Sequence, residues 1–132
     1  MNDETLSIRQ IAESSNLSAY TLRYYESIGL IPWVKRHPGS THRIYNQFHI
    51  EWIEYLKAFR SSGMSIKDLR EYVRLMESGD STIKGRIRIL EAHRAKIKKE
   101  MDEIINNLKL IEHKITHYRS IERKMSSLRK DI

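Results

Sequence analysis

Residues 18–26 read Ser-Ala-Tyr-Thr-Leu-Arg-Tyr-Tyr-Glu, and this stretch decides how the rest of the chain is interpreted. Ser18 is a favoured N-cap residue, so a short helix is expected to begin there. Because residues three and four apart are neighbours on a helix, Tyr20, Arg23 and Tyr24 share one face, and the leucine lies toward the other. Such a helix suits insertion into a groove of DNA. An ordinary amphipathic helix with half-buried tyrosines fits the same nine residues.

A second short helix is predicted just before this stretch. Residues 7–10, Ser-Ile-Arg-Gln, have the form of a capping box, and Ile11 and Ala12 continue a helical apolar pattern. Asn16 tolerates the left-handed backbone of a tight turn, and Ser18 starts the next helix at once. Two short helices joined by such a turn form a helix-turn-helix, whose second helix reads DNA.

Residues 31–45 predict a small basic hairpin, or wing, after the second helix. Two extended runs, 31–35 and 42–45, flank a turn at Pro38-Gly39. A hairpin of this size has little stability of its own, so its cations are better explained by a phosphate backbone lying against them. A solvated loop is the alternative. The cationic side chains of the wing are Lys35, Arg36, His37, His42 and Arg43.

Two longer helices are predicted to complete the core of this domain. Asn46 caps a third helix, whose apolar stripe runs over 48–59 and which ends at Ser62-Gly63. Ser65 caps a fourth helix, which ends at Ser78-Gly79. Two aromatic residues of the third helix, Trp52 and Phe59, are assigned to the core.

From residue 81 onward, apolar residues recur in steps that alternate four and three. A heptad held over about six repeats indicates a coiled coil, because a narrow apolar stripe on one long helix needs a partner helix. No second helix of comparable length is predicted, so the simplest partner is another copy. Arg94 and Glu122 interrupt the stripe, and its spacing does not choose between parallel and antiparallel pairing. The apolar positions, named here the seam, are Ile83, Ile87, Leu90, Ile97, Met101, Ile104, Leu108, Ile111, Ile115 and Tyr118.

Composition narrows the classes of function. The chain carries 24 Lys and Arg against 17 Asp and Glu, a net charge of +7, which favours a polyanionic partner such as nucleic acid or an acidic membrane surface. No apolar run approaches the ~18 residues of a membrane span, and the N-terminus lacks the features of a signal peptide, so a cytoplasmic location is expected. The absence of cysteine excludes disulfides, thiolate metal sites and a cysteine nucleophile.

The other chemistry-bearing patterns are weak. His113 and His117 lie four apart on the long helix, a spacing that suits two ligands of one metal ion, but they lie off the seam and only Glu112 is near as a third ligand. No metal site and no cofactor are predicted. The chain has no phosphate-cradling glycine loop, nucleophile elbow or His-Glu zinc motif, so it is not expected to be an enzyme.

Taken together, residues 7–79 resemble the MerR family of bacterial transcription regulators. The most specific match is Leu-Arg-Tyr-Tyr-Glu at 22–26 followed by Ile-Gly-Leu at 28–30. A single long helix after the fourth helix fits the same family. Further matching segments are Ile8-Arg9-Gln10-Ile11-Ala12, Leu17-Ser18, His42-Arg43-Ile44-Tyr45 and Arg60-Ser61-Ser62-Gly63-Met64-Ser65.

The resemblance implies a mainly α fold with three parts. A winged helix-turn-helix domain is expected over 5–79, an antiparallel coiled-coil dimerisation helix over 80–125 and a disordered tail over 126–132. It also implies a homodimer that binds a palindromic promoter and bends and untwists the DNA, so that RNA polymerase gains or loses access. A coiled-coil scaffold and a non-specific DNA-packaging protein are the alternatives.

The resemblance also bears on a small effector, which would select between two shapes of the dimer. Mercury- and copper-type members use cysteines that this chain lacks. Ala58 stands where some aldehyde-responsive members carry a cysteine. Thiolate sensing is therefore not expected, and the effector has no assigned identity.

The expected DNA contacts come from the second helix and the wing. Arg23 reaches a phosphate or a guanine edge, Tyr24 bonds phosphate, and Tyr20 lies where the family varies, so it contributes to site preference. Arg43 and Tyr45 match the family's wing signature and are expected to bind the backbone. The full set is Ser18, Tyr20, Thr21, Arg23, Tyr24, Lys35, Arg36, His42, Arg43 and Tyr45.

Overall fold

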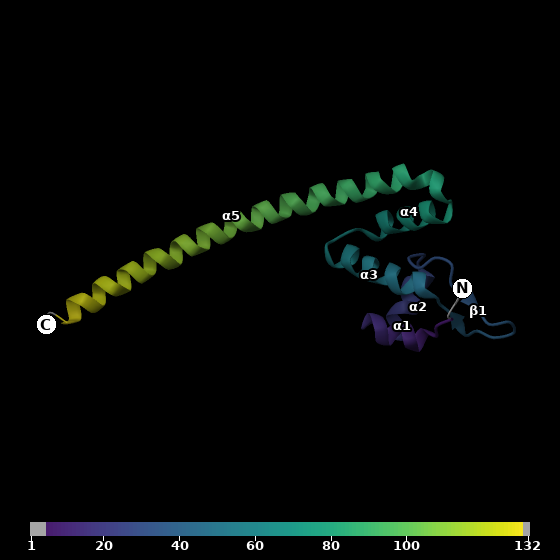
Figure 1. Cartoon of the computed structure of the whole chain (residues 1–132). Helices are drawn as coiled ribbons and strands as arrows, with labels where there is room; N and C mark the ends of the chain where they lie inside the picture. Colours follow the sequence, from purple (N-terminus) through teal and green to yellow (C-terminus); the bar gives the residue numbers. More distant parts are fainter. Residues whose placement is uncertain (1–4, 131–132) are drawn as a thin grey trace. The chain divides into compact units, whose positions relative to one another are not determined.

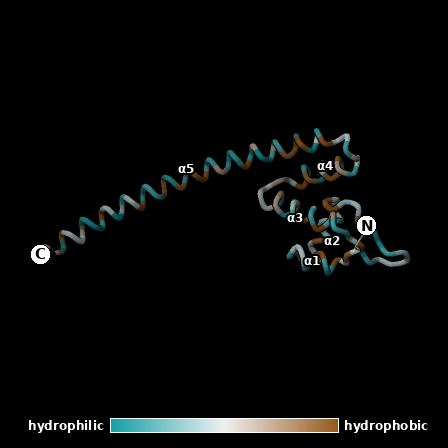
Figure 2. Tube along the Cα trace, in the orientation of Figure 1, coloured by the Kyte–Doolittle hydropathy of each residue, from teal (hydrophilic) through white to brown (hydrophobic). Residues whose placement is uncertain are grey.

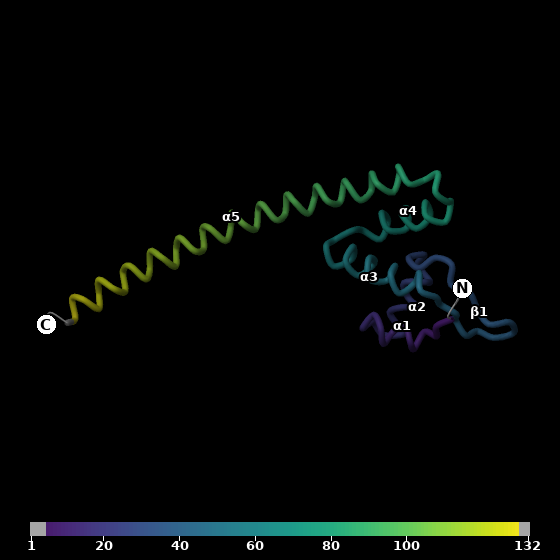
Figure 3. The backbone as a smooth tube through the Cα atoms, in the orientation of Figure 1, coloured from purple at the N-terminus to yellow at the C-terminus, as the bar shows by residue number. Residues whose placement is uncertain are grey.

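The structure, a computed structural model, describes residues 5–130 and is mainly helical (Figure 1). The chain divides into two compact units, one ending at Glu91 and the other starting at Ala92. Figure 3 traces the backbone of the first unit from α1 through α2 into the hairpin. The elements are α1 (Ile8–Ser15), α2 (Ala19–Ser27), β1 (Lys35–Arg36), β2 (Arg43–Ile44), α3 (Gln47–Ser61), α4 (Ile66–Glu77), the 3-10 turn η1 (Asp80–Thr82) and α5 (Ile83–Lys130).

Caps formed by neighbouring residues set the ends of the helix-turn-helix and confirm its prediction. The Ser7 hydroxyl accepts from the Gln10 N–H at 3.2 Å, and the Gln10 carbonyl oxygen of the side chain accepts from the Ser7 N–H at 2.7 Å. Asn16 adopts the left-handed conformation, with φ 60°. The Ser18 hydroxyl then accepts from the Thr21 N–H at 3.0 Å, which starts α2 two residues after the turn.

The core of the first unit is one apolar cluster that joins α1, α2, α3 and α4. Burial of a Leu, Ile or Met side chain contributes about 1.5–3 kcal/mol each, so this cluster is what holds α2 in place. The buried apolar residues are Ile11, Leu22, Leu30, Ile31, Tyr45, Trp52, Ile53, Leu56, Met64, Leu69, Val73 and Met76.

Trp52 is buried, which confirms its assignment to the core, and it links three parts of that core. Its indole N–H donates to the carbonyl of Leu30 at 2.8 Å, just beyond the end of α2. Its ring stacks on Tyr72 of α4 at 5.6 Å with an interplanar angle of 5°, and Phe59 packs edge-on at 6.2 Å. The polar edge of the indole is therefore satisfied inside the core, and α3 is fixed to both α2 and α4.

The segment between α2 and the wing departs from the extended run predicted at 31–35. Ile31 is buried in the core, and Trp33 has φ 60°, a left-handed conformation that a β-strand does not contain. The Trp33 ring packs against Phe48 at 5.1 Å. Strand pairing begins only at Lys35, so the prediction of an extended strand is wrong for residues 31–34.

His49 is a buried polar residue that joins the start of α3 to this segment. Its Nδ1 accepts from the Asn46 N–H at 3.1 Å, and its Nε2 donates to the carbonyl of Pro32 at 2.8 Å. This arrangement needs the neutral ring with its proton on Nε2. Desolvation lowers the pKa of His49, against the opposing effect of the Pro32 hydrogen bond.

We expect this histidine to make folding sensitive to acid. The unfolded chain takes up the proton near pH 6.5, and the folded chain does so only at lower pH. The stabilisation is therefore complete above about pH 6.5 and is lost as the pH falls through the folded-state pKa. In urea unfolding at pH 7.5 and 5.0, His49→Gln should lose less stability on acidification than the wild type. A His113→Gln control should match the wild type, and equal losses for all three chains would contradict the assignment.

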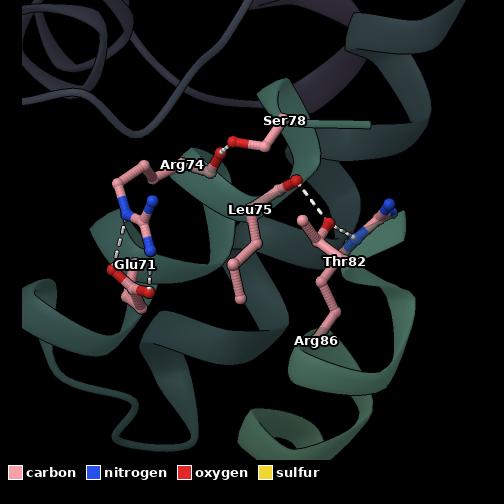
Figure 4. A network of polar contacts seen from close by, with 6 residues as sticks. All are labelled: Glu71, Arg74, Leu75, Ser78, Thr82 and Arg86. Atoms are coloured by element: carbon pink, nitrogen blue, oxygen red, sulfur yellow. Dashed lines mark hydrogen bonds and ion pairs between the residues drawn. The ribbon is translucent and has the colours of Figure 1, made fainter. Parts of the chain in front are cut away.

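A polar network connects α4, η1 and the start of α5 (Figure 4). The Thr82 hydroxyl donates to the carbonyl of Leu75 at 2.5 Å, and the guanidinium of Arg86 donates to the same hydroxyl at 3.2 Å. Ile89 and Leu90 are partly buried against the core. The compact unit that ends at Glu91 therefore includes the first turns of α5, beyond the domain boundary predicted at 79/80.

The second unit is helical from Ala92 to the end of α5. Apolar positions recur among polar ones along this helix (Figure 2), and the seam residues Met101, Ile104, Leu108, Ile111 and Tyr118 are exposed in the single chain. The helix reaches Lys130, so the disordered tail predicted over 126–132 is wrong for residues 126–130; residues 131–132 lie outside the described part. Within residues 5–130, no helix combines the length and the apolar character that crossing a bilayer would need.

Candidate nucleic-acid interface

The outer face of α2 is polar and open to solvent. Tyr20, Arg23 and Tyr24 are exposed, whereas Leu22 is fully buried and Tyr25 packs against the core. The solvent-facing side of α2, which carries Tyr20, Arg23 and Tyr24, is here named the front of α2, and it is the side that helical spacing predicted. That this front contacts DNA remains a prediction.

The first turn of α2 presents two hydroxyl groups. The Ser18 hydroxyl donates to the Thr21 hydroxyl at 2.9 Å while it accepts the N–H that caps the helix. The hydrogen of the Thr21 hydroxyl is then available for a phosphate oxygen, and the positive end of the helix dipole lies beside it. Ser18 acts mainly through the cap, because its hydroxyl already donates one hydrogen bond and accepts another within the first turn of α2.

Cations on neighbouring helices fix the ends of the helix-turn-helix. The Nε of Arg70 on α4 donates to the carbonyl of Ile28 at the end of α2, at 2.6 Å. The Nζ of Lys57 on α3 donates to the carbonyl of Ser15 at the end of α1, at 2.5 Å. Cations at these carboxyl ends satisfy carbonyls and oppose the negative end of each helix dipole. Sequence reasoning missed both residues, because the partners lie 42 positions apart.

The wing is short and basic. β1 pairs antiparallel with β2, with Lys35 opposite Ile44 and Arg36 opposite Arg43. Lys35 and His42 are exposed, as their predicted contact with a phosphate backbone requires. Arg36 and Arg43 are both bound by one carboxylate of α2, that of Glu26, to which the sequence assigned no role.

Tyr45 does not lie on the surface of the wing. Its side chain is only 1% exposed and packs edge-on to the His49 ring at 5.3 Å. Its backbone N–H and C=O pair with those of Leu6 at 2.8 Å each, and burial raises the pKa of its hydroxyl. The prediction that Tyr45 binds the DNA backbone is therefore wrong: this tyrosine belongs to the core.

A Tyr45→Phe variant should separate the two roles. Among the described residues the buried Tyr45 hydroxyl has no hydrogen-bond partner, so its removal should leave stability unchanged or raise it by about 1 kcal/mol. Affinity for DNA should not change, because the hydroxyl is not accessible. Thermal unfolding and a gel shift measure the two quantities, and a tenfold loss of affinity with unchanged stability would restore Tyr45 to the interface.

The histidine pair on the long helix has no third ligand in place. His113 and His117 are exposed, and within residues 5–130 no group of three or more His, Asp or Glu side chains gathers as metal ligands. The His117 ring lies 5.9 Å from that of Tyr118. Among the described residues, the basic side chains of α2 and the wing are therefore better candidates for a binding site than the histidine pair.

Comparisons with known proteins agree with this geometry. A family profile described as MerR HTH family regulatory protein matches residues 6–76. The HTH-type transcriptional regulator AdhR of Bacillus subtilis is 44% identical over 92 residues, which are 70% of this chain and 65% of the relative. The chain thus spans slightly less than two thirds of that protein's length. An uncharacterised HTH-type regulator of Haemophilus influenzae is 32% identical over 114 residues, 86% of this chain and 84% of the relative.

Solved structures show the same architecture. A MerR family transcriptional regulator from Listeria monocytogenes is 32% identical, with a TM-score of 0.86 over 96% of this chain and 95% of that one. HiNmlR, described as a MerR family regulator lacking the sensor domain and bound to promoter DNA, is 31% identical, with a TM-score of 0.76 over 88% of this chain and 91% of that one.

Proposed function

The chain belongs to the MerR family of DNA-binding transcriptional regulators, and on this basis we propose that it acts as a homodimer on a palindromic promoter. The observation that carries the proposal is that the first unit presents an open Arg/Tyr face while the long helix presents an uncovered apolar seam. The first feature suits a groove of DNA, and the second suits pairing with another helix. Its partner in this proposal is double-stranded promoter DNA, and the protein acts in the cytoplasm, as expected of a bacterial regulator of this family.

The seam supports the homodimer. An α-helix of the 48 residues of α5 is about 70 Å long at 1.5 Å per residue. Apolar side chains spaced along such a length cannot all be covered by the small core of their own chain. A second copy in antiparallel orientation buries both seams and carries one DNA-binding unit at each end.

Two reading helices explain how a site is found. One α2 reaches only a few base pairs, whereas two copies held about one turn of DNA apart read both halves of a palindrome. In this mechanism part of the binding energy bends and untwists the DNA between the half-sites, so that the spacer sequence is read through its deformability. The distorted promoter changes the access of RNA polymerase, and a small effector would act by shifting the shape of the dimer.

Competitive DNA binding tests the proposal. Sites are first selected from a randomised duplex library with the full chain, and the selected duplex is then titrated against random duplex at fixed salt. A regulator of this kind should select a palindrome and prefer it by a thousandfold or more. Equal affinity for both duplexes would identify a packaging protein, and binding to neither would identify a scaffold.

A further inference from the structure

Glu26 lies where its own helix disfavours an acidic side chain. It is in the last turn of α2, next to the negative end of the helix dipole. Glu26 is also the acidic residue of α2, the helix proposed to approach DNA phosphate groups, which repel a carboxylate. Its side chain is nevertheless only 16% exposed. A compensating interaction must therefore hold it there.

Two arginines of the wing supply that interaction. The Oε1 of Glu26 accepts from the Nη2 of Arg36 on β1 at 3.3 Å. Its other oxygen, Oε2, accepts from the Nε of Arg43 on β2. One carboxylate of the recognition helix thus binds both strands of the wing.

The wing needs this carboxylate because its arginines face each other. Arg36 lies directly opposite Arg43 in the β1–β2 register, and like charges at paired positions destabilise a hairpin. Strands of two residues each contribute little stability of their own. Glu26 neutralises the repulsion and at the same time fixes the position of the wing relative to α2.

The two arginines differ in their access to a partner. The side chain of Arg43 is 22% exposed, and it follows the inward course of β2, which continues into the buried Tyr45. The side chain of Arg36 is 43% exposed. Arg36 can therefore exchange the carboxylate for a phosphate without disturbing the core, whereas Arg43 cannot.

We propose that Glu26 is a positioning residue of the DNA interface: it holds the wing at a fixed place beside α2 through Arg43, and it releases Arg36 to a DNA phosphate on binding. This inference rests on the proposed function. It assigns to an acidic residue a contribution to specific affinity that its charge alone would oppose. Arg43 becomes a supporting residue, and Arg36 becomes the phosphate contact of the pair.

Glu26→Gln in the full chain tests the role of the carboxylate. Affinity for the selected palindrome should fall about tenfold or more, because the wing and α2 no longer meet the DNA in one geometry. Affinity for random duplex should stay constant or rise, because a negative charge has been removed. Glu71→Gln removes another arginine-bound carboxylate, from α4, and should change neither affinity. An equal fall on both duplexes, or no change on the palindrome, would overturn the proposal.

The single variants of Arg36 and Arg43 test the different roles of the two arginines and do not depend on how well Glu26→Gln folds. Arg36→Gln should reduce the salt dependence of binding on both duplexes by about one phosphate contact per protomer. Arg43→Gln should lower affinity for the palindrome alone. The double variant of Glu26→Gln with Arg43→Gln should bind the palindrome no more weakly than either single variant. Glu26→Asp should retain part of the preference for the palindrome that Glu26→Gln loses. Additive losses of affinity in the double variant, or an unchanged salt slope for Arg36→Gln, would contradict the proposed role of Glu26. Absence of palindrome preference in the wild type would instead reject the proposed function itself.

Discussion

A chain that carries aspartate in place of Leu108 is expected to be monomeric and to bind the selected palindrome at least a hundredfold more weakly. Leu108 lies on the seam of α5 and is exposed in the single chain. Each dimer contains two copies, so two leucine burials of about 1.5–3 kcal/mol are lost together. Two carboxylates would in addition have to be desolvated in the interface. The sum is about 3–6 kcal/mol or more, which corresponds to a factor of a hundred to ten thousand in the dimer equilibrium.

Leu110 offers a matched control on the same helix. It is also exposed, but it lies two residues further on and on a different face of the helix, so Leu110→Asp introduces the same charge without entering the interface. Sedimentation equilibrium should give a dimer for the wild type and Leu110→Asp and a monomer for Leu108→Asp. A Leu108→Asp chain that remains dimeric would show that the seam is not the interface. If it became monomeric and kept full affinity, the two-unit mode of binding would be wrong.

The helix-turn-helix could be predicted well because its signals are local. The capping box of Ser7 and Gln10, the left-handed turn at Asn16 and the cap at Ser18 each depend on residues within four positions of one another. Hydrogen bonds over such short separations are set by the sequence itself. The front of α2 follows from helical periodicity in the same way.

The wing could not be predicted in full because long-range contacts determine it. Tyr45 is pulled inward by its pairing with Leu6 and by the ring of His49. In an extended strand, residues two apart lie on the same face, so an inward Tyr45 also turns Arg43 toward the molecule and to Glu26. The sequence motif shows that these residues belong together, but the motif alone does not distinguish packing from a contact with DNA.

The two ends of α5 likewise show what the sequence pattern predicts and what it does not. The seam repeat predicted a long helix from about residue 81, and α5 begins at Ile83, but the repeat did not reveal that Leu90 packs against the core of the first unit. Its polar end was interpreted as a tail, although Arg, Lys and Met are good helix formers and carry the helix on to Lys130. Helical periodicity thus identifies the element, and packing and intrinsic propensity decide where it ends.

Arg23→Ala should also have a large effect: it should weaken binding to DNA and leave the dimer intact. Arg23 is exposed on the same side of α2 as Tyr20 and Tyr24, and it makes no ion pair among the described residues. A lost arginine contact typically costs about 1–3 kcal/mol, and a homodimer loses two. Affinity for the palindrome should therefore fall by a factor of about thirty to ten thousand. The dimer should persist because the seam is untouched.

Binding to two kinds of duplex identifies which DNA group Arg23 contacts. If the guanidinium bonds a guanine edge, Arg23→Ala lowers affinity for the palindrome and leaves random duplex almost unaffected, so the preference shrinks. If it bonds a phosphate, both affinities fall together and the salt slope decreases by about one per protomer. Arg74→Ala removes an exposed arginine from α4, where Glu71 already binds it, and should change neither affinity. Because α2 has no other cation, unchanged affinity for Arg23→Ala would mean that this helix does not read the DNA through charge at all.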